Sequence, residues 1–484
     1  MLRLLVSEMA QEKWPSNRLR RGGKDDTTRY DTIRRAFAEF LALPTWIILG
    51  FLLLAIGFYF LDRAEITWLT PLRTILRTRV FANAQATSDL LSTIASGIIT
   101  VTSITISLLL LALQQSAASL SSAVFDQFLR RPHNQIYFGF FVGLALYTLV
   151  TLATVDDPFN PVFGASLAFL LTVVALYLLI VLLYTTVNQT RPIEIIETIH
   201  DHTLAARIRQ LDLIHKTRRT AQSDGHVCTP VTTTKRGFVT HIDIAALGAA
   251  ADQQAGEVEI VLRVSIGAYL AFQDVLGTVR AQNEGAAAAI GEVVRRTIHL
   301  ERQRDITVDP AYGIEQLEMV AWTSISTSKS NPQPGLLTIR SLRDILARWS
   351  VEEDKAADAQ PFPVVYQDNV VEQLMDTFET LAVVSSESMQ HQNFIEVVHT
   401  FALMFDRLPA PWQARTEDLI LRILSALGDH VLTAQLDLAL TDLIKTLTAS
   451  ARFETAAAVR TAQDQLRLSI GKLNSRATRV ASKG

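Results

Sequence analysis

Four long stretches without Asp, Glu, Lys, Arg or His constrain the fold of this chain more than any other feature. They cover residues 41–61, 94–113, 136–155 and 163–187. Each has at least about 20 residues, the length at which an α-helix crosses the hydrocarbon core of a bilayer. A backbone in lipid must satisfy its own hydrogen bonds, so we expect four transmembrane helices within a membrane domain at 41–187.

Lysine and arginine gather on one side of these spans. Residues 1–40 contain nine, the loop between the second and third spans contains two, and residues 188–220 contain six. The two opposite loops contain four and none. Because positive side chains favour the cytoplasmic side, we expect both termini, including the tail 1–40, in the cytoplasm.

Composition narrows the function classes further. The net charge is -3, which gives no general attraction to nucleic acid, so we expect no nucleic-acid partner. Cys228 is the single cysteine, which excludes an intramolecular disulfide and a cysteine-based zinc site. Ion-coupled pumps and voltage sensors need ionisable groups inside the membrane, and the four spans contain none.

After the spans, the periodicity predicts a mixed α+β cytoplasmic region. We expect an amphipathic connecting helix at 188–226 and a small β-rich module at 227–282, where apolar and polar residues alternate. A helical segment with a polar loop follows at 283–352, and a C-terminal helical domain at 364–484. The predicted fold class is therefore an α-helical membrane protein with four transmembrane helices, a β-rich module and a C-terminal helical domain.

The second span carries polar side chains at helical spacing, which places them on one face. These residues are Ser92, Ser96, Thr100, Ser103, Ser107 and Gln114. Small hydroxyl residues often pack helices against one another in lipid. Hydroxyls can also line a pore that apolar rings gate, if copies of this span surround an axis. The sequence leaves helix packing and pore lining open.

The third span contains Gly139 and Gly143 in a Gly-x-x-x-Gly spacing. Glycines four residues apart let a neighbouring helix approach closely, so these two are candidate helix-packing positions.

No motif for catalysis stands out. The chain has no phosphate-binding Gly-x-x-x-x-Gly-Lys loop, no His-Glu-x-x-His and no EF-hand loop, so we expect no enzyme activity, metal or cofactor. Arg304, Asp305, Asp309 and Asn331 mark a candidate loop for a ligand or partner. Asp309 precedes Pro310, so capping of a helix explains it equally well.

Several segments resemble the family of bacterial predicted membrane proteins called domain of unknown function 2254. The similar segments are 96–108, 112–115, 128–135, 237–243 and 304–313. The resemblance implies four spans and a cytosolic domain in a bacterial inner (plasma) membrane, and it implies no established activity.

Two functions fit these expectations. The first is a homo-oligomeric channel or conductance regulator, with the second span around the axis. The alternative is a membrane-anchored sensor or scaffold whose cytoplasmic region binds a soluble partner or ligand. In both cases the lipid bilayer is a partner of the chain.

Overall fold

The computed structural model describes residues 41–64, 69–79, 81, 83–119, 132–156, 159–189, 191–222, 227–254, 257–326, 331–352, 361–427 and 430–469. The predicted N-terminal tail, residues 1–40, lies outside this part of the chain. The chain divides into two compact units. The membrane unit comprises residues up to 108 and 127–182, and the second unit comprises 109–126 and the residues from 183 onward.

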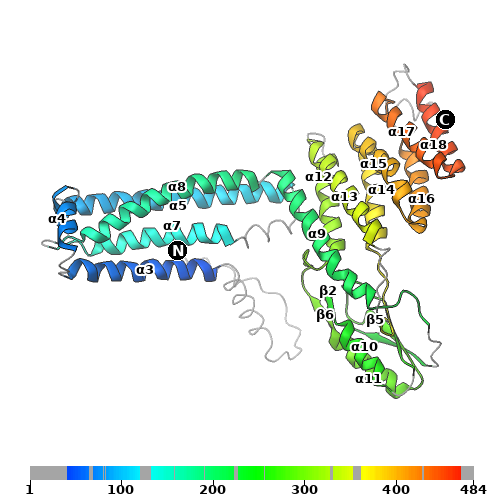
Figure 1. Ribbon diagram of the computed structural model, residues 1–484, viewed down its shortest axis with the longest axis horizontal. Helices are drawn as coiled ribbons and strands as arrows, with labels where there is room; N and C mark the ends of the chain where they lie inside the picture. The colour runs from blue at the N-terminus through cyan, green and yellow to red at the C-terminus, as the bar shows by residue number, and fades with distance from the viewer. Residues whose placement is uncertain are drawn as a thin grey trace, which may run out of the picture. The chain divides into compact units, whose positions relative to one another are not determined.

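The membrane unit contains the long apolar helices and one short helix (Figure 1). They are α3 (Ala42–Arg63), α4 (Thr70–Arg79), α5 (Ala84–Ser119), α7 (Pro132–Ala153) and α8 (Val162–Gln189). Four helices are long and apolar enough to cross a membrane, namely Ala42–Arg63, Ala84–Leu108, Gln135–Ala153 and Val162–Thr185. The predicted four-span architecture is confirmed. α5 begins well before residue 94, because Asn83 Oδ1 accepts from the Ala86 amide (2.7 Å) and nothing after it interrupts the helix.

The core of the membrane unit is a layer of aromatic and aliphatic side chains between the four spans. Phe51 of α3 meets Phe140 and Tyr147 of α7 edge to face, with ring centroids 5.5 Å and 6.4 Å away. α5 contributes Leu91 and Ile98, which are buried in the same cluster.

After α8, the second unit contains α9 (Pro192–His215) and then a β-rich module with two small sheets. Its elements are β1 (Val227–Thr232), β2 (Gly237–Ile242), α10 (Ile244–Asp252), β3 (Glu259–Leu262), β4 (Tyr269–Leu270), β5 (Val275–Ala281), α11 (Glu284–Thr297), β6 (Ile298–Glu301) and β7 (Val364–Val365). One sheet has the order β1-β5-β3-β7 and the other β4-β2-β6. The sheets thus extend beyond residue 282, because β6 pairs with β2 and β7 runs parallel to β3.

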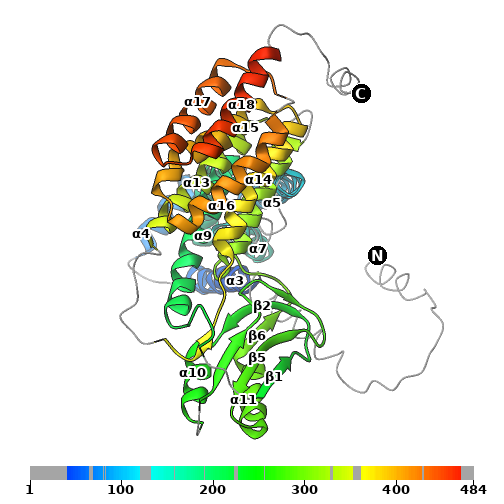
Figure 2. The same cartoon turned by 90° about the vertical axis from the view of Figure 1, so that its right-hand side faces the viewer.

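The remaining helices form a stack of antiparallel neighbours. They are α12 (Pro310–Ser326), α13 (Gln333–Glu352), α14 (Val370–Glu387), α15 (His391–Met404), α16 (Ala410–Leu427), α17 (Ala434–Ala449) and α18 (Phe453–Ser469), with the short η3 (Phe405–Arg407) after α15. α12, α14, α16 and α18 contact one another in turn, and α13, α15 and α17 form a second row. Figures 1 and 2 show these helices following one another along the stack, from yellow-green to red. The mixed region and the C-terminal helices agree with the predicted fold class.

A buried arginine ties the connecting helix to the rest of the second unit. Arg207 of α9 is 1% exposed and donates to Asp368 Oδ2 at 2.6 Å and Gln210 Oε1 at 2.9 Å. Its guanidinium also lies over the ring of Trp349, 5.1 Å from the centroid. Beside it, burial raises the pKa of Tyr366 to about 12. This network fixes α9 against α13 and the segment before α14.

Candidate functional site

The hydroxyl face of α5 points away from the other helices of its own bundle. Ser92, Ser96, Thr100, Ser103 and Ser107 are all exposed. On the opposite face of α5, Leu91, Ile94 and Ile98 are buried in the bundle core. At 3.6 residues per turn these two groups occupy opposite sides of the helix. A single copy of the chain therefore leaves the polar face of its second span without a protein neighbour in the described part of the bundle.

Three of the hydroxyls on this face donate to the backbone of α5 itself. Thr100 Oγ1 donates to the Ser96 carbonyl at 2.8 Å, and Ser107 Oγ donates to the Ser103 carbonyl at 2.9 Å. Ser103 Oγ makes the same kind of bond to Ile99, at 3.0 Å. Each of these three hydroxyls uses its one hydrogen in this way and keeps its acceptor lone pairs facing outward. The face can therefore tolerate lipid, pack against another helix or solvate a passing cation.

Apolar side chains border the hydroxyl face. Ile99 and Ile106 flank it on one side and Ile104 flanks it on the other, and all three are exposed. Leu110 and Leu111 are exposed further along α5. The side chain of Gln114 lies outside the described residues, although α5 runs through this position. The face is thus a polar strip with apolar margins.

The two glycines of the third span lie where α7 packs against α3. A Cβ added to Gly139 would lie 3.0 Å from Pro44 Cα. A Cβ added to Gly143 would lie 2.5 Å from Phe51 Cδ2. The glycine pair therefore makes room for the first span.

Sequence reasoning missed a polar cluster at the end of the bundle where α3 stops and α8 begins. Asp62 is 8% exposed and accepts from the amides of Phe163 at 3.0 Å and Gly164 at 2.9 Å. A carboxylate at these N-terminal amides complements the dipole of α8. Tyr147 OH donates to the Gly164 carbonyl at 2.9 Å and closes the cluster from α7.

The predicted ligand loop is occupied by bonds within the protein. Arg304 Nε donates to Asp309 Oδ2 at 2.7 Å, its Nη1 bonds Glu315, and its guanidinium lies over Tyr312, 4.7 Å from the ring centroid. Burial lowers the pKa of Arg304, but the bonds with Asp309 and Glu315 outweigh it, so the pKa is raised overall.

The remaining loop residues act as local caps. Asp309 Oδ1 accepts from the Tyr312 amide at 3.1 Å at the start of α12, and Asp305 Oδ1 accepts from the Thr307 amide at 2.9 Å. Asn331 Oδ1 accepts from the Gln333 amide at 3.1 Å at the start of α13. Within the described residues, no hydrogen bond or ion pair joins Asn331 to Arg304, so the two lie at separate helix starts.

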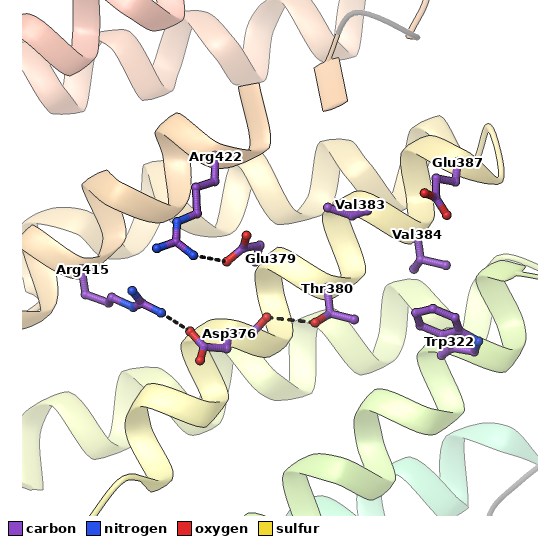
Figure 3. A pocket seen from close by; sticks show the side chains of 9 residues that line it. All are labelled: Trp322, Asp376, Glu379, Thr380, Val383, Val384, Glu387, Arg415 and Arg422. Carbon is purple, nitrogen blue, oxygen red and sulfur yellow. Dashed lines mark hydrogen bonds and ion pairs between the residues drawn. The ribbon is translucent and has the colours of Figure 1, made fainter. Parts of the chain in front are cut away.

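A groove crosses α12, α14 and α16 of the helical stack, and no sequence motif marked it. It has a volume of about 390 Å³ (Figure 3). At one end Arg415 Nη2 bonds Asp376 Oδ1 at 2.5 Å, and Arg422 Nη1 lies 3.6 Å from Glu379 Oε2. The pKa of Arg415 is raised, mainly because its guanidinium donates a hydrogen bond to the Asp376 carboxylate.

The other end of this groove is apolar and acidic. Figure 3 shows Trp322, Val384 and Glu387 together there, with Val383 between the two ends. Trp322 is 46% exposed, so the face of its indole is open to a ligand in the groove. An exposed indole beside carboxylates is suited to a cationic, partly apolar ligand.

Comparison with known protein families gives a result that agrees with the membrane architecture. A family model described as predicted membrane protein, domain of unknown function 2254, matches residues 38–390. The chain belongs to the domain of unknown function 2254 family. No curated protein and no solved structure matches the chain. Membership in the domain of unknown function 2254 family agrees with the four candidate spans, and its description names no activity.

The match to the domain of unknown function 2254 covers some of the candidate features and not others. It includes all four spans, the glycine pair and the loop around Arg304. It ends just before α15, so α12 and α14 of the groove lie within it, whereas Arg415 and Arg422 of α16 lie beyond it.

Proposed function

We propose that the chain is a subunit of a homo-oligomeric channel or conductance regulator in a bacterial inner membrane, with α5 around the central axis. The observation that supports this proposal is the exposed hydroxyl face of α5, which lies opposite the face that forms the bundle core. The isoleucines on its margins offer apolar contacts between neighbouring copies, and the outward lone pairs replace water around an ion. This role is non-enzymatic.

We propose further that both termini are cytoplasmic, in line with the lysine and arginine bias. Four arginines in the loop after the first span oppose this orientation, but two of them serve the fold. Arg73 Nη2 donates to the carbonyls of Leu61, Asp62 and Ala64, 2.9–3.1 Å away. The Arg63 guanidinium lies over the Tyr59 ring, 5.3 Å from its centroid.

Cysteine accessibility in a reconstituted bilayer tests the channel role. Cys228 is exposed and is the only cysteine, so Cys228→Ser gives a background for single cysteines. We expect a charged, water-soluble thiol reagent to reduce conductance through Thr100→Cys or Ser103→Cys. Phe169→Cys on the exposed surface of α8 is the matched control and should show no effect.

The same cysteines report the assembly. Oxidation should cross-link copies through Ser96→Cys or Thr100→Cys and give a ladder of defined oligomers. A monomer without conductance, in which Thr100→Cys reacts only with lipid-soluble reagents, would contradict the proposal.

The groove across α12, α14 and α16 favours a second candidate function, a scaffold or sensor that binds a soluble partner. Stacked helix pairs present extended surfaces that bind other proteins. The groove combines an exposed Trp322 with three acids and two arginines, so the acids exceed the arginines by one, which suits a basic, amphipathic segment.

Photo-crosslinking in cells tests this second candidate. A photoreactive amino acid at Val383 should give one adduct of defined mass, and Asp376→Lys with Glu379→Lys should abolish it. The same amino acid at Phe453, which is exposed on α18, should give no such adduct. An adduct that survives the charge reversal would count against the groove.

A further inference from the structure

The short helix α4, between the first and second spans, is amphipathic and basic. Its sequence, TPLRTILRTR, contains three arginines and no acid. Leu72 and Ile75 lie on one side and are 48% and 57% exposed. Thr74 lies on the other side, where its Oγ1 donates to the Thr70 carbonyl at 2.9 Å.

The helix is held at the very end of the bundle. Arg73 bonds the carbonyls at the end of α3, and its guanidinium lies 5.5 Å from the centroid of the Phe163 ring at the start of α8. Leu76 packs against the core of the membrane unit. Figure 1 shows α4 turned across the ends of the long helices. A helix across the ends of spanning helices runs parallel to the plane of the membrane.

We propose that α4 is an interfacial helix that lies in the headgroup layer of the bilayer. Leu72 and Ile75 sit among the upper acyl chains, and Arg77 contacts the phosphates of anionic phospholipids. A helix with an apolar face and arginines beside it has the composition of segments that lie in this layer. Arginine binds phosphate through two parallel hydrogen bonds, and negative lipids add further attraction.

The position of α4 favours lipid, rather than protein or water, as the neighbour of its exposed apolar side chains. Leu72 and Ile75 are exposed at the level where α3 ends and α8 begins, which is where hydrocarbon meets headgroups if these helices span the membrane. Arg77 is exposed on the same helix, and α4 itself contains no acid. The nearby carboxylate of Asp62 on α3 is buried and accepts from the amides of α8, so it leaves the exposed guanidinium of Arg77 open to an outside anion. Charge complementarity therefore points to a negative headgroup.

Spin labels on the full chain test the depth of α4. Single cysteines at Leu72, Ile75 and Thr74 on the Cys228→Ser background are labelled and placed in nanodiscs of phosphatidylcholine and phosphatidylglycerol. Collisions with oxygen, which concentrates in lipid, should exceed collisions with a soluble nickel chelate at Leu72 and Ile75. The order should reverse at Thr74, the matched control on the same helix.

Two results would overturn this placement. If Leu72 and Thr74 meet the nickel chelate equally, α4 lies in water. If Leu72 is shielded from both oxygen and nickel, protein covers it, as in a contact between two copies.

Retained lipid tests the phosphate contact. Native mass spectrometry of the full chain should show phosphatidylglycerol bound to the parent protein and to Arg77→Lys, and its loss in Arg77→Gln. Equal retention in Arg77→Gln would overturn the contact. Because Arg77 is exposed, both variants should keep the melting temperature of the parent, which separates lipid loss from misfolding.

Discussion

Asp62 Oδ2 accepts a hydrogen bond from the backbone amide of Gly164 at 2.9 Å, so the end of the first span is tied to the start of the fourth. The two residues are far apart in the sequence, and their bond sets how α3 and α8 align at this end of the bundle.

Asp62→Ala should destabilise the membrane unit by about 2 kcal/mol, because it leaves two buried amides of α8 without their acceptor. Thermal unfolding in detergent measures this loss. Asp156→Ala removes an exposed carboxylate from the loop just before α8 and is the matched control. Equal melting temperatures for the two variants would show that the cap contributes nothing.

Gly143→Ala should cost about 1–3 kcal/mol, because the new Cβ would press on the Phe51 ring in a packed helix contact. Gly97→Ala on α5 is the matched control, since no atom lies within 4 Å of its added Cβ. Phe51→Leu combined with Gly143→Ala should recover part of the loss. If Gly143→Ala melts like Gly97→Ala, the close approach of α3 and α7 is not needed for stability.

Arg207→Met should destabilise the second unit by about 3 kcal/mol, because it leaves Asp368 without its principal ion-pair partner in a mostly buried position. Urea unfolding followed by tryptophan fluorescence would report the loss, since Arg207 lies over Trp349. Arg209→Met, two residues along α9, removes only an exposed hydrogen bond to the Thr307 carbonyl and should change stability by less than about 1 kcal/mol. A smaller effect at Arg207 than at Arg209 would refute the structural role of the network.

The C-terminal stack should lose stability as the pH falls below about 6.5, the value for a free histidine. Burial lowers the pKa of His391 in the folded protein, so the unfolded chain binds a proton more readily. The stability that neutral His391 contributes is thus fully present above pH 6.5 and decreases as acid favours the unfolded state.

Melting temperatures between pH 7.5 and 5.5 measure this dependence. The partner of His391 is His430, whose Nδ1 lies 2.6 Å from the His391 Nδ1, so the pair cannot hold two protons at this contact. His391→Gln should flatten the pH dependence. An unchanged slope would assign the acid sensitivity to other groups.

The four spans could be predicted because length and the absence of charge are local properties that lipid imposes on any crossing helix. The hydroxyl spacing on α5 likewise follows from helical periodicity alone. Which face of α5 points into the bundle depends on the core that it shares with residues far along the chain, such as Phe141 and Leu144 of α7. The sequence pattern therefore located the polar strip but not its neighbours.

The features that sequence reasoning missed depend on long-range pairing. β6 and β7 are short, and they form strands only because β6 pairs with β2 and β7 pairs with β3. From the sequence alone, Asp62 is expected to be a loop residue. Its role as a cap appears only when the fold brings the amides of Phe163 and Gly164 to its carboxylate. The groove at Trp322 arises only when α12, α14 and α16 lie side by side, and no local period encodes that order.

The stack of helices has a consequence for how such chains diversify. Each helix from α12 to α18 contacts its nearest neighbours in the stack, and α17 and α18 are the last pair within the described residues. Architectures of this kind grow or shrink by whole units at the free end, because no closing contact has to be remade. The family match stops just before α15, so we expect members of the family to differ mainly in the helices that follow α14.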